Sequence, residues 1–79
     1  METAYVLLTC DLGHEEVIIE DLKHIDSVSE VSGVYGAYDI VAKVENSEKD
    51  KLRETITWKI RKLDHVRSTL TLMVIQGQN

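Results

Sequence analysis

The spacing of apolar residues changes repeatedly along the chain, and this succession of patterns is what most restricts the fold. Residues 4–11 are apolar at nearly every position, which is typical of a strand buried on both faces. From His14 the pattern changes, because Ile18, Leu22 and Ile25 recur at spacings of four and three. A buried strand is therefore predicted to lead into a helix with one core-facing stripe.

The middle of the chain has the pattern of a hairpin. Residues 28–35 and 38–45 alternate well enough to be two strands, and Gly36-Ala37 between them predicts a tight antiparallel turn. Gly33 lies inside the first of these strands, where glycine indicates a bulge or the close approach of another backbone.

The last third repeats the strand and helix patterns. Asn46-Ser47 is a suitable cap for a second helix, which ends near Asp64. Residues 66–75 are rich in β-branched side chains and predict a closing strand. The core stripe of the second helix consists of Leu52, Ile56, Ile60 and Leu63.

The predicted order is strand, helix, strand, strand, helix, strand. Because right-handed crossovers place both helices on one side, we expect an α+β, ferredoxin-like βαββαβ fold: a four-stranded antiparallel sheet with two helices on one face. The 79 residues leave room for one domain, residues 1–79, and a core this small favours association.

The first and last predicted strands have apolar residues on both of their faces. In the first strand Tyr5 and Leu7 point to one face and Val6, Leu8 and Cys10 to the other; in the last strand Leu70, Leu72 and Val74 point to one face and Met73 and Ile75 to the other. Two helices cover only one face, so the open face is predicted to pack against a second copy. The expected assembly is a homodimer, a dimeric α/β sandwich.

Composition and charge exclude several classes of protein. No apolar run approaches the roughly 18 residues of a membrane span, and the start lacks the basic residues of a secretory signal, so a cytoplasmic protein with no membrane partner is expected. The net charge of −5 disfavours direct binding of nucleic acid. Cys10 is the only cysteine, and its apolar neighbours predict a buried, inert thiol rather than a reactive one.

Catalytic and metal chemistry have little support. His14, His24 and His65 lack the spacing of a metal site, and no phosphate-binding, dinucleotide-binding or nucleophile-elbow motif is present. We therefore predict no catalytic residue, no metal and no cofactor. Trp58 falls outside the core stripe of its helix, which fits either a half-exposed ring over neighbouring Lys and Arg stems or a contact between subunits.

The turn at residues 36–39 is the candidate site. Its backbone N–H groups are able to receive a carboxylate, while Asp39 and the hydroxyls of Thr69 and Thr71 are suited to an ammonium or another polar group. The alternative for Asp39 is a side chain that satisfies its own turn. For the two threonines it is ordinary strand propensity with cross-strand pairing.

Residues 36–39 also resemble the G-x-Y-D turn of the effector-binding domain of Lrp/AsnC regulators, the regulation of amino-acid metabolism domain, and residues 66–71 resemble its closing V-x-x-T-x-T strand. Further positions where this chain is similar to the family are Gly13, Leu22, Ile25, Val28, Glu30, Val31, Ile40, Lys43, Val44, Leu52, Ile60 and Leu63.

The resemblance implies a ferredoxin-like fold, dimers through the open sheet face, and tetramers or octamers of those dimers. It also implies amino-acid effectors bound between dimers at Gly36, Ala37, Tyr38 and Asp39, with Thr69 and Thr71. Ala37 departs from the family, in which this position is often acidic.

The family's helix-turn-helix is not found before the first strand, so the resemblance implies a stand-alone effector domain. We therefore expect an amino-acid-binding regulatory module that co-assembles with full-length Lrp/AsnC regulators. The rival hypothesis is a small dimeric ferredoxin-like enzyme, of the cofactor-independent monooxygenase or isomerase type, with its pocket between sheet and helices.

Overall fold

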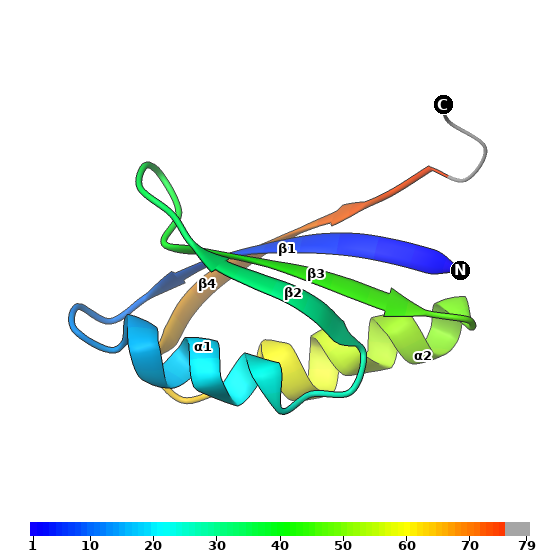
Figure 1. The fold of residues 1–79 in the computed structure, drawn as a ribbon, viewed down its shortest axis with the longest axis horizontal. Helices are drawn as coiled ribbons and strands as arrows, with labels where there is room; N and C mark the ends of the chain where they lie inside the picture. Colours follow the sequence, from blue (N-terminus) through cyan, green and yellow to red (C-terminus); the bar gives the residue numbers. More distant parts are fainter. Residues whose placement is uncertain (76–79) are drawn as a thin grey trace.

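The computed structural model describes residues 1–75 and has the predicted order of elements, with the second helix divided into an α-helical and a π-helical part (Figure 1). The last four residues of the predicted domain lie outside the described residues. The elements are β1 (Glu2–Cys10), α1 (Glu15–Lys23), β2 (Val28–Gly33), β3 (Ile40–Asn46), α2 (Lys49–Glu54), η1 (Thr55–Ile60) and β4 (Val66–Met73).

The four strands form one antiparallel sheet in the order β2-β3-β1-β4, and α1, α2 and η1 lie on one face of it (Figure 1). The ferredoxin-like α+β prediction is therefore confirmed. The central strand β1 sets the register, because Leu8 pairs with Ile40 of β3 on one side and with Thr69 of β4 on the other. The outer strands β2 and β4 form the two edges.

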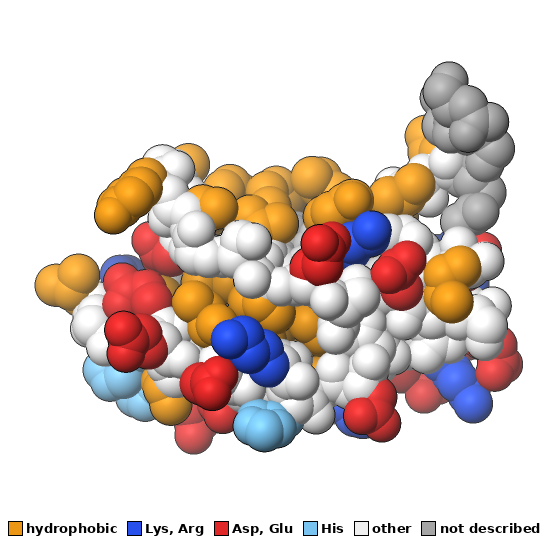
Figure 2. Space-filling view, viewed as in Figure 1, with side chains coloured by type: hydrophobic (Ala, Val, Ile, Leu, Met, Phe, Trp, Pro, Cys, Tyr) orange, Lys and Arg blue, Asp and Glu red, His pale blue; other side chains and the backbone are white. Residues whose placement is uncertain are grey.

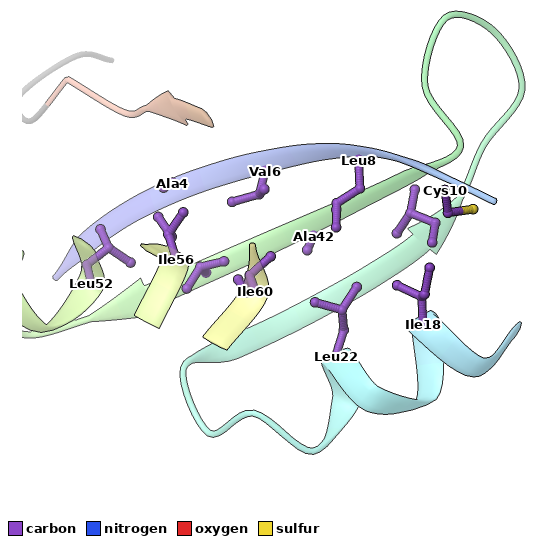
Figure 3. Packing of buried hydrophobic residues seen from close by; sticks show 12 residues of the cluster. Ala4, Val6, Leu8, Cys10, Ile18, Leu22, Ala42, Leu52, Ile56 and Ile60 are labelled. Carbon is purple, nitrogen blue, oxygen red and sulfur yellow. The ribbon is translucent and has the colours of Figure 1, made fainter. Parts of the chain in front are cut away.

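The core lies between the sheet and the helices, where apolar side chains from both layers meet (Figure 3). Every second residue of β1 points into it, as the alternation of a strand requires. Its members are Ala4, Val6, Leu8, Cys10, Ile18, Leu22, Ile40, Ala42, Val44, Leu52, Ile56 and Ile60. Leu52, Ile56 and Ile60 were predicted from the helical stripe, whereas Leu63 is only half-buried at its rim.

The second helix changes its hydrogen bonding along its length. From Thr55 to Ile60 it is a π-helix, and the Arg61 N–H donates to the Ile56 oxygen, five residues back, at 3.0 Å. The predicted cap lies slightly outside the helix, because Asn46 Oδ1 accepts from the Glu48 N–H at 3.0 Å and Glu48 is the residue that precedes α2.

The hairpin differs from the prediction in two details. The strands end at Gly33 and resume at Ile40, so a loop of residues 34–39 replaces the predicted tight Gly36-Ala37 turn. The irregularity of β2 falls between Val28 and Glu30 rather than at Gly33. What approaches Gly33 is the side chain of Ile19, whose Cδ1 lies 3.6 Å from the position of a Cβ.

The face of the sheet away from the helices is open and apolar in the single chain. Orange side chains gather along this side in Figure 2. We call it the open face and define it by Tyr5, Leu70, Leu72 and Val74, which are 37% to 48% exposed. Met73, from the opposite set of β4, faces the helix side, since it pairs with the buried Ala4.

Candidate ligand-binding site

Asp39 is fixed at the junction between the β2–β3 loop and the central strand. Its N–H donates to the Leu8 oxygen at 2.9 Å, and its oxygen accepts from the Val34 N–H at 2.9 Å, which closes the loop. Its carboxylate Oδ2 accepts from the Cys10 N–H at 3.0 Å. The alternative expected this side chain to satisfy its own turn, but its backbone partner lies on β1, 29 residues away.

The loop itself projects above the sheet, away from the helices (Figure 1). Gly36 has φ +131°, a conformation that residues with a side chain rarely adopt, so glycine is required at this point of the loop. Gly36 and Ala37 are exposed, and Tyr38 is half-buried. Among residues 1–75, none of these three N–H groups donates a hydrogen bond to another backbone group, so all three remain open to an acceptor.

A cavity of about 370 Å³ lies where this loop meets the start of α1. Its lining residues are Glu15, Gly33, Val34, Tyr35 and Asp39. Both carboxylates are half-buried, which weakens solvent screening and favours a cation between them. The cavity is of a size suited to a small molecule, and its polar groups favour an amine.

Glu15 is the residue that sequence reasoning missed. The structure places it in the first turn of α1, beside another acidic residue. Its approach to Asp39 depends on the tertiary path of the chain, because α1 begins beside the loop that joins β2 to β3. No local pattern distinguishes Glu15 from its neighbour Glu16.

Cys10 lies beneath Asp39 and is buried, as predicted. Burial raises the pKa of its thiol, and the negative charges of Asp39 and Glu15 raise it further. The Sγ atom lies 3.8 Å from Asp39 Oδ2. A thiol with a raised pKa stays protonated at neutral pH, so it is a poor nucleophile.

Thr69 and Thr71 do not join this cavity within one chain. They pair with Leu8 and Val6 across β1, so their side chains share the helix-facing side of β4. Thr69 is separated from Ile40 by two strand spacings, roughly 10 Å. Thr71 lines a different cavity, beside η1. Within residues 1–75, Asp39 is the one predicted site residue that lines the cavity, while Thr69 and Thr71 lie on β4, with β1 between them and β3.

The histidines show an arrangement that their spacing in the sequence did not reveal. His14 and His65 stack with ring centroids 3.8 Å apart, and His65 Nδ1 lies 3.4 Å from Asp11 Oδ2. Within residues 1–75, no group of three or more His, Cys, Asp or Glu side chains is placed to hold a metal ion. The stack joins the loop after β1 to the loop before β4.

Trp58 agrees with the first of its two interpretations. Its side chain is 67% exposed, and Lys62 Nζ lies 5.6 Å from the ring centroid, within the range of a cation–π contact.

In the part of the chain that the structure describes, no helix is long and apolar enough to cross a membrane.

The fold is that of a small ferredoxin-like α+β domain with a surface cavity at its β2–β3 loop. The chain belongs to the Lrp/AsnC family, since the model of the Lrp/AsnC ligand-binding domain matches residues 3–77. A search of curated proteins gave no significant match.

Three solved structures illustrate the family relationship. FFRP-DM1 is 37% identical, with a TM-score of 0.90, 95% of this chain covered and 100% of the other. TTHA0845 from Thermus thermophilus is 30% identical, with a TM-score of 0.91 and coverage of 100% and 99%. AsnC of E. coli is 26% identical, with a TM-score of 0.87; 96% of this chain matches 52% of AsnC.

Proposed function

We propose that this domain binds a small amino acid beside Asp39 and acts as the sensing module of a transcription-regulating assembly. The observation that carries the proposal is the cavity of about 370 Å³ in which the Asp39 and Glu15 carboxylates lie beside a loop with open N–H groups. A related fold supports the choice of ligand: the regulator NMB0573 from Neisseria meningitidis, 9% identical with a TM-score of 0.84, was solved in complex with L-Met.

The proposed contacts follow from the donors and acceptors present. One Asp39 oxygen is engaged by the Cys10 N–H, and the other makes no hydrogen bond within residues 1–75, so it is able to accept from an ammonium group. Glu15 adds a second negative charge. The N–H groups of Gly36, Ala37 and Tyr38 are the donors for the ligand carboxylate.

The predicted role of Thr69 and Thr71 requires a second copy of the chain. In one subunit they lie on β4, with β1 between them and β3, so β4 of a neighbouring subunit would have to bring its threonines to the loop. We propose that dimers form through the open face and assemble further into tetramers or octamers, including assemblies with full-length regulators in the cytoplasm. Ligand binding shifts such assembly only through a difference in affinity between the states.

Calorimetric titration of the wild-type protein with each of the twenty amino acids tests the proposal. Asp39→Asn keeps an acceptor for the Cys10 N–H but removes the charge, so it should weaken binding of the identified amino acid about tenfold to a hundredfold. Glu15→Gln should also weaken it, whereas Glu16→Gln, a neighbouring exposed carboxylate, should not. Thr71→Val should have the smaller effect of one lost neutral hydrogen bond, about 1 kcal/mol.

Two results would contradict the proposal: no heat of binding with any amino acid, or an affinity unchanged in both Asp39→Asn and Glu15→Gln. A circular dichroism melt of each variant separates loss of the ligand from loss of the fold. If binding survives in Asp39→Asn but disappears in Thr71→Val, the site lies instead in the cavity between η1 and β4.

The proposal is for binding rather than catalysis. The enzyme hypothesis expected a pocket between sheet and helices, but that space is filled by core side chains such as Leu8, Leu22 and Ile60, each 0% exposed (Figure 3). The cavities found among residues 1–75 are open at the surface, and the one between the second helix and β4 has no His or Tyr in its lining. A cavity at a junction between dimers favours sensing, whereas an enclosed cavity lined by His or Tyr favours catalysis.

A further inference from the structure

Basic residues are concentrated in one part of this acidic chain. Residues 1–48 hold two Lys or Arg and eleven Asp or Glu, whereas residues 49–79 hold seven Lys or Arg and three Asp or Glu. The basic segment includes α2, η1 and the start of β4. The surface around these elements therefore attracts anions although the whole chain is negative.

A cavity of about 270 Å³ lies within this basic region, between the second helix and the edge strand β4. Its lining residues are Arg53, Ile56, Thr57, Arg61, Thr71 and Met73. No Asp or Glu side chain of residues 1–75 lines it. Arg53, Thr57 and Arg61 follow one another at spacings of four, which carries them along the same side of the helix.

The two guanidinium groups are available to a ligand. Neither Arg53 nor Arg61 forms an ion pair within residues 1–75, although three of the chain's lysines do. Two like charges at one concavity repel each other, and an anion between them removes that repulsion. Guanidinium groups are also the side chains best matched to the planar geometry of a carboxylate.

The edge of the sheet adds a further donor. The Val74 N–H donates to the Thr3 oxygen at 2.9 Å, and N–H groups alternate sides along an antiparallel strand. The Thr71 N–H therefore points away from β1, toward the open edge. With the hydroxyls of Thr57 and Thr71, the cavity offers several donors beside its two positive charges.

The floor of the cavity is apolar. Ile56 is 4% exposed and Met73 is 37% exposed, so Ile56 contributes carbon atoms to the lining and Met73 contributes carbon and sulfur. A bare inorganic anion makes no use of these atoms, and a nucleic acid backbone is too large for a concavity of this volume. The lining best suits a small molecule with an anionic head and a short aliphatic chain.

We propose that this second cavity, at the junction of α2, η1 and β4, binds small organic monoanions: an aliphatic carboxylate held by Arg53 and Arg61, with its chain on Ile56 and Met73. The cavity is separate from the Asp39 cavity and opposite to it in charge. A carboxylic acid without an amino group fits it, because no acidic side chain is present to receive an ammonium. The domain then has two sites that distinguish amino acids from their deaminated counterparts.

Titration followed by NMR, with isocaproate and its neutral amide isocaproamide as probes, tests this proposal on the intact chain. Isocaproate should shift the amide signals of residues 53–61 and of Thr71, in a way that weakens as salt is added. Isocaproamide should bind at least about tenfold more weakly, since it lacks the charge that a guanidinium recognises.

Arg53→Gln and Arg61→Gln should each weaken isocaproate binding about tenfold to a hundredfold. Arg67→Gln is the matched control, because Arg67 is exposed on β4 and does not line the cavity. Asp39→Asn should leave isocaproate binding unchanged, so failure of the amino-acid site and failure of this one are distinguishable. The inference is overturned if isocaproate and isocaproamide bind alike, if Arg67→Gln weakens binding as much as the cavity variants, or if only duplex DNA shifts these signals.

Discussion

Leu72→Glu provides a direct test of the proposed dimer. Leu72 lies on the open face and is 48% exposed in the single chain. Complete burial of such a side chain is worth roughly 1.5 to 3 kcal/mol, so burying the exposed half contributes about 1 kcal/mol.

Leu72→Glu removes about 2 kcal/mol of burial free energy from the dimer, because the side chain is lost from both subunits. It also places two carboxylates in an apolar interface, which costs several kcal/mol more. The combined loss is therefore at least about 4 kcal/mol, which raises the dissociation constant at least roughly a thousandfold. Sedimentation velocity at micromolar concentration should therefore show a dimer for the wild-type protein and a monomer for Leu72→Glu.

Leu12→Glu is the matched control, since it makes the same chemical change at a residue that is 94% exposed in the loop after β1. Met73→Glu, on the helix-facing side of β4, should also remain dimeric. The reasoning is refuted if Leu72→Glu sediments as a dimer, or if Leu12→Glu dissociates to the same extent.

Two further predictions concern stability. In the folded protein the pKa of the Cys10 thiol is raised above 9.0, so the unfolded chain loses this proton at a lower pH than the folded chain does. The contribution of the protonated thiol to the free energy of unfolding is therefore complete below pH 9.0 and is lost as the pH rises through the pKa of the folded state. Urea unfolding at neutral and strongly alkaline pH should thus show a smaller alkaline loss for Cys10→Ala; equal losses would contradict it. Gly36→Ala should lower the free energy of unfolding by about 1 to 3 kcal/mol through backbone strain, because no atom lies within 4 Å of the added Cβ. An unchanged urea midpoint would show that the loop relaxes.

The element order was predictable because hydrophobic spacing is a local property. The strand and helix patterns around Leu8, Ile18 and Ile56 depend only on near neighbours in the sequence, and their side chains occupy the core as expected. Several boundaries differ from the prediction by a few residues, among them those of the hairpin. Gly36-Ala37 suggested a short turn, but the hydrogen bond between Val34 and Asp39 closes a longer loop.

The site was only partly predictable, because the contacts that bring its residues together are not a local property of the sequence. Asp39 was identified from the turn, whereas its partner Cys10 and its companion Glu15 reach it through tertiary contacts. The shared side of Thr69 and Thr71 followed from strand alternation. Their distance from Asp39 did not, because it depends on the strand order, which puts β1 between β3 and β4.

The π-helical segment Thr55–Ile60 affects how related sequences should be aligned with this one. A hydrogen bond to the fifth residue back encloses one more residue than the bond of an α-helix. A relative with a regular α-helix here is therefore expected to be one residue shorter, with the deletion inside residues 55–60. If the gap is placed in a loop instead, Arg61 is aligned with the wrong position of the relative. A relative that retains the counterparts of both Arg53 and Arg61 is then wrongly taken to lack one of them.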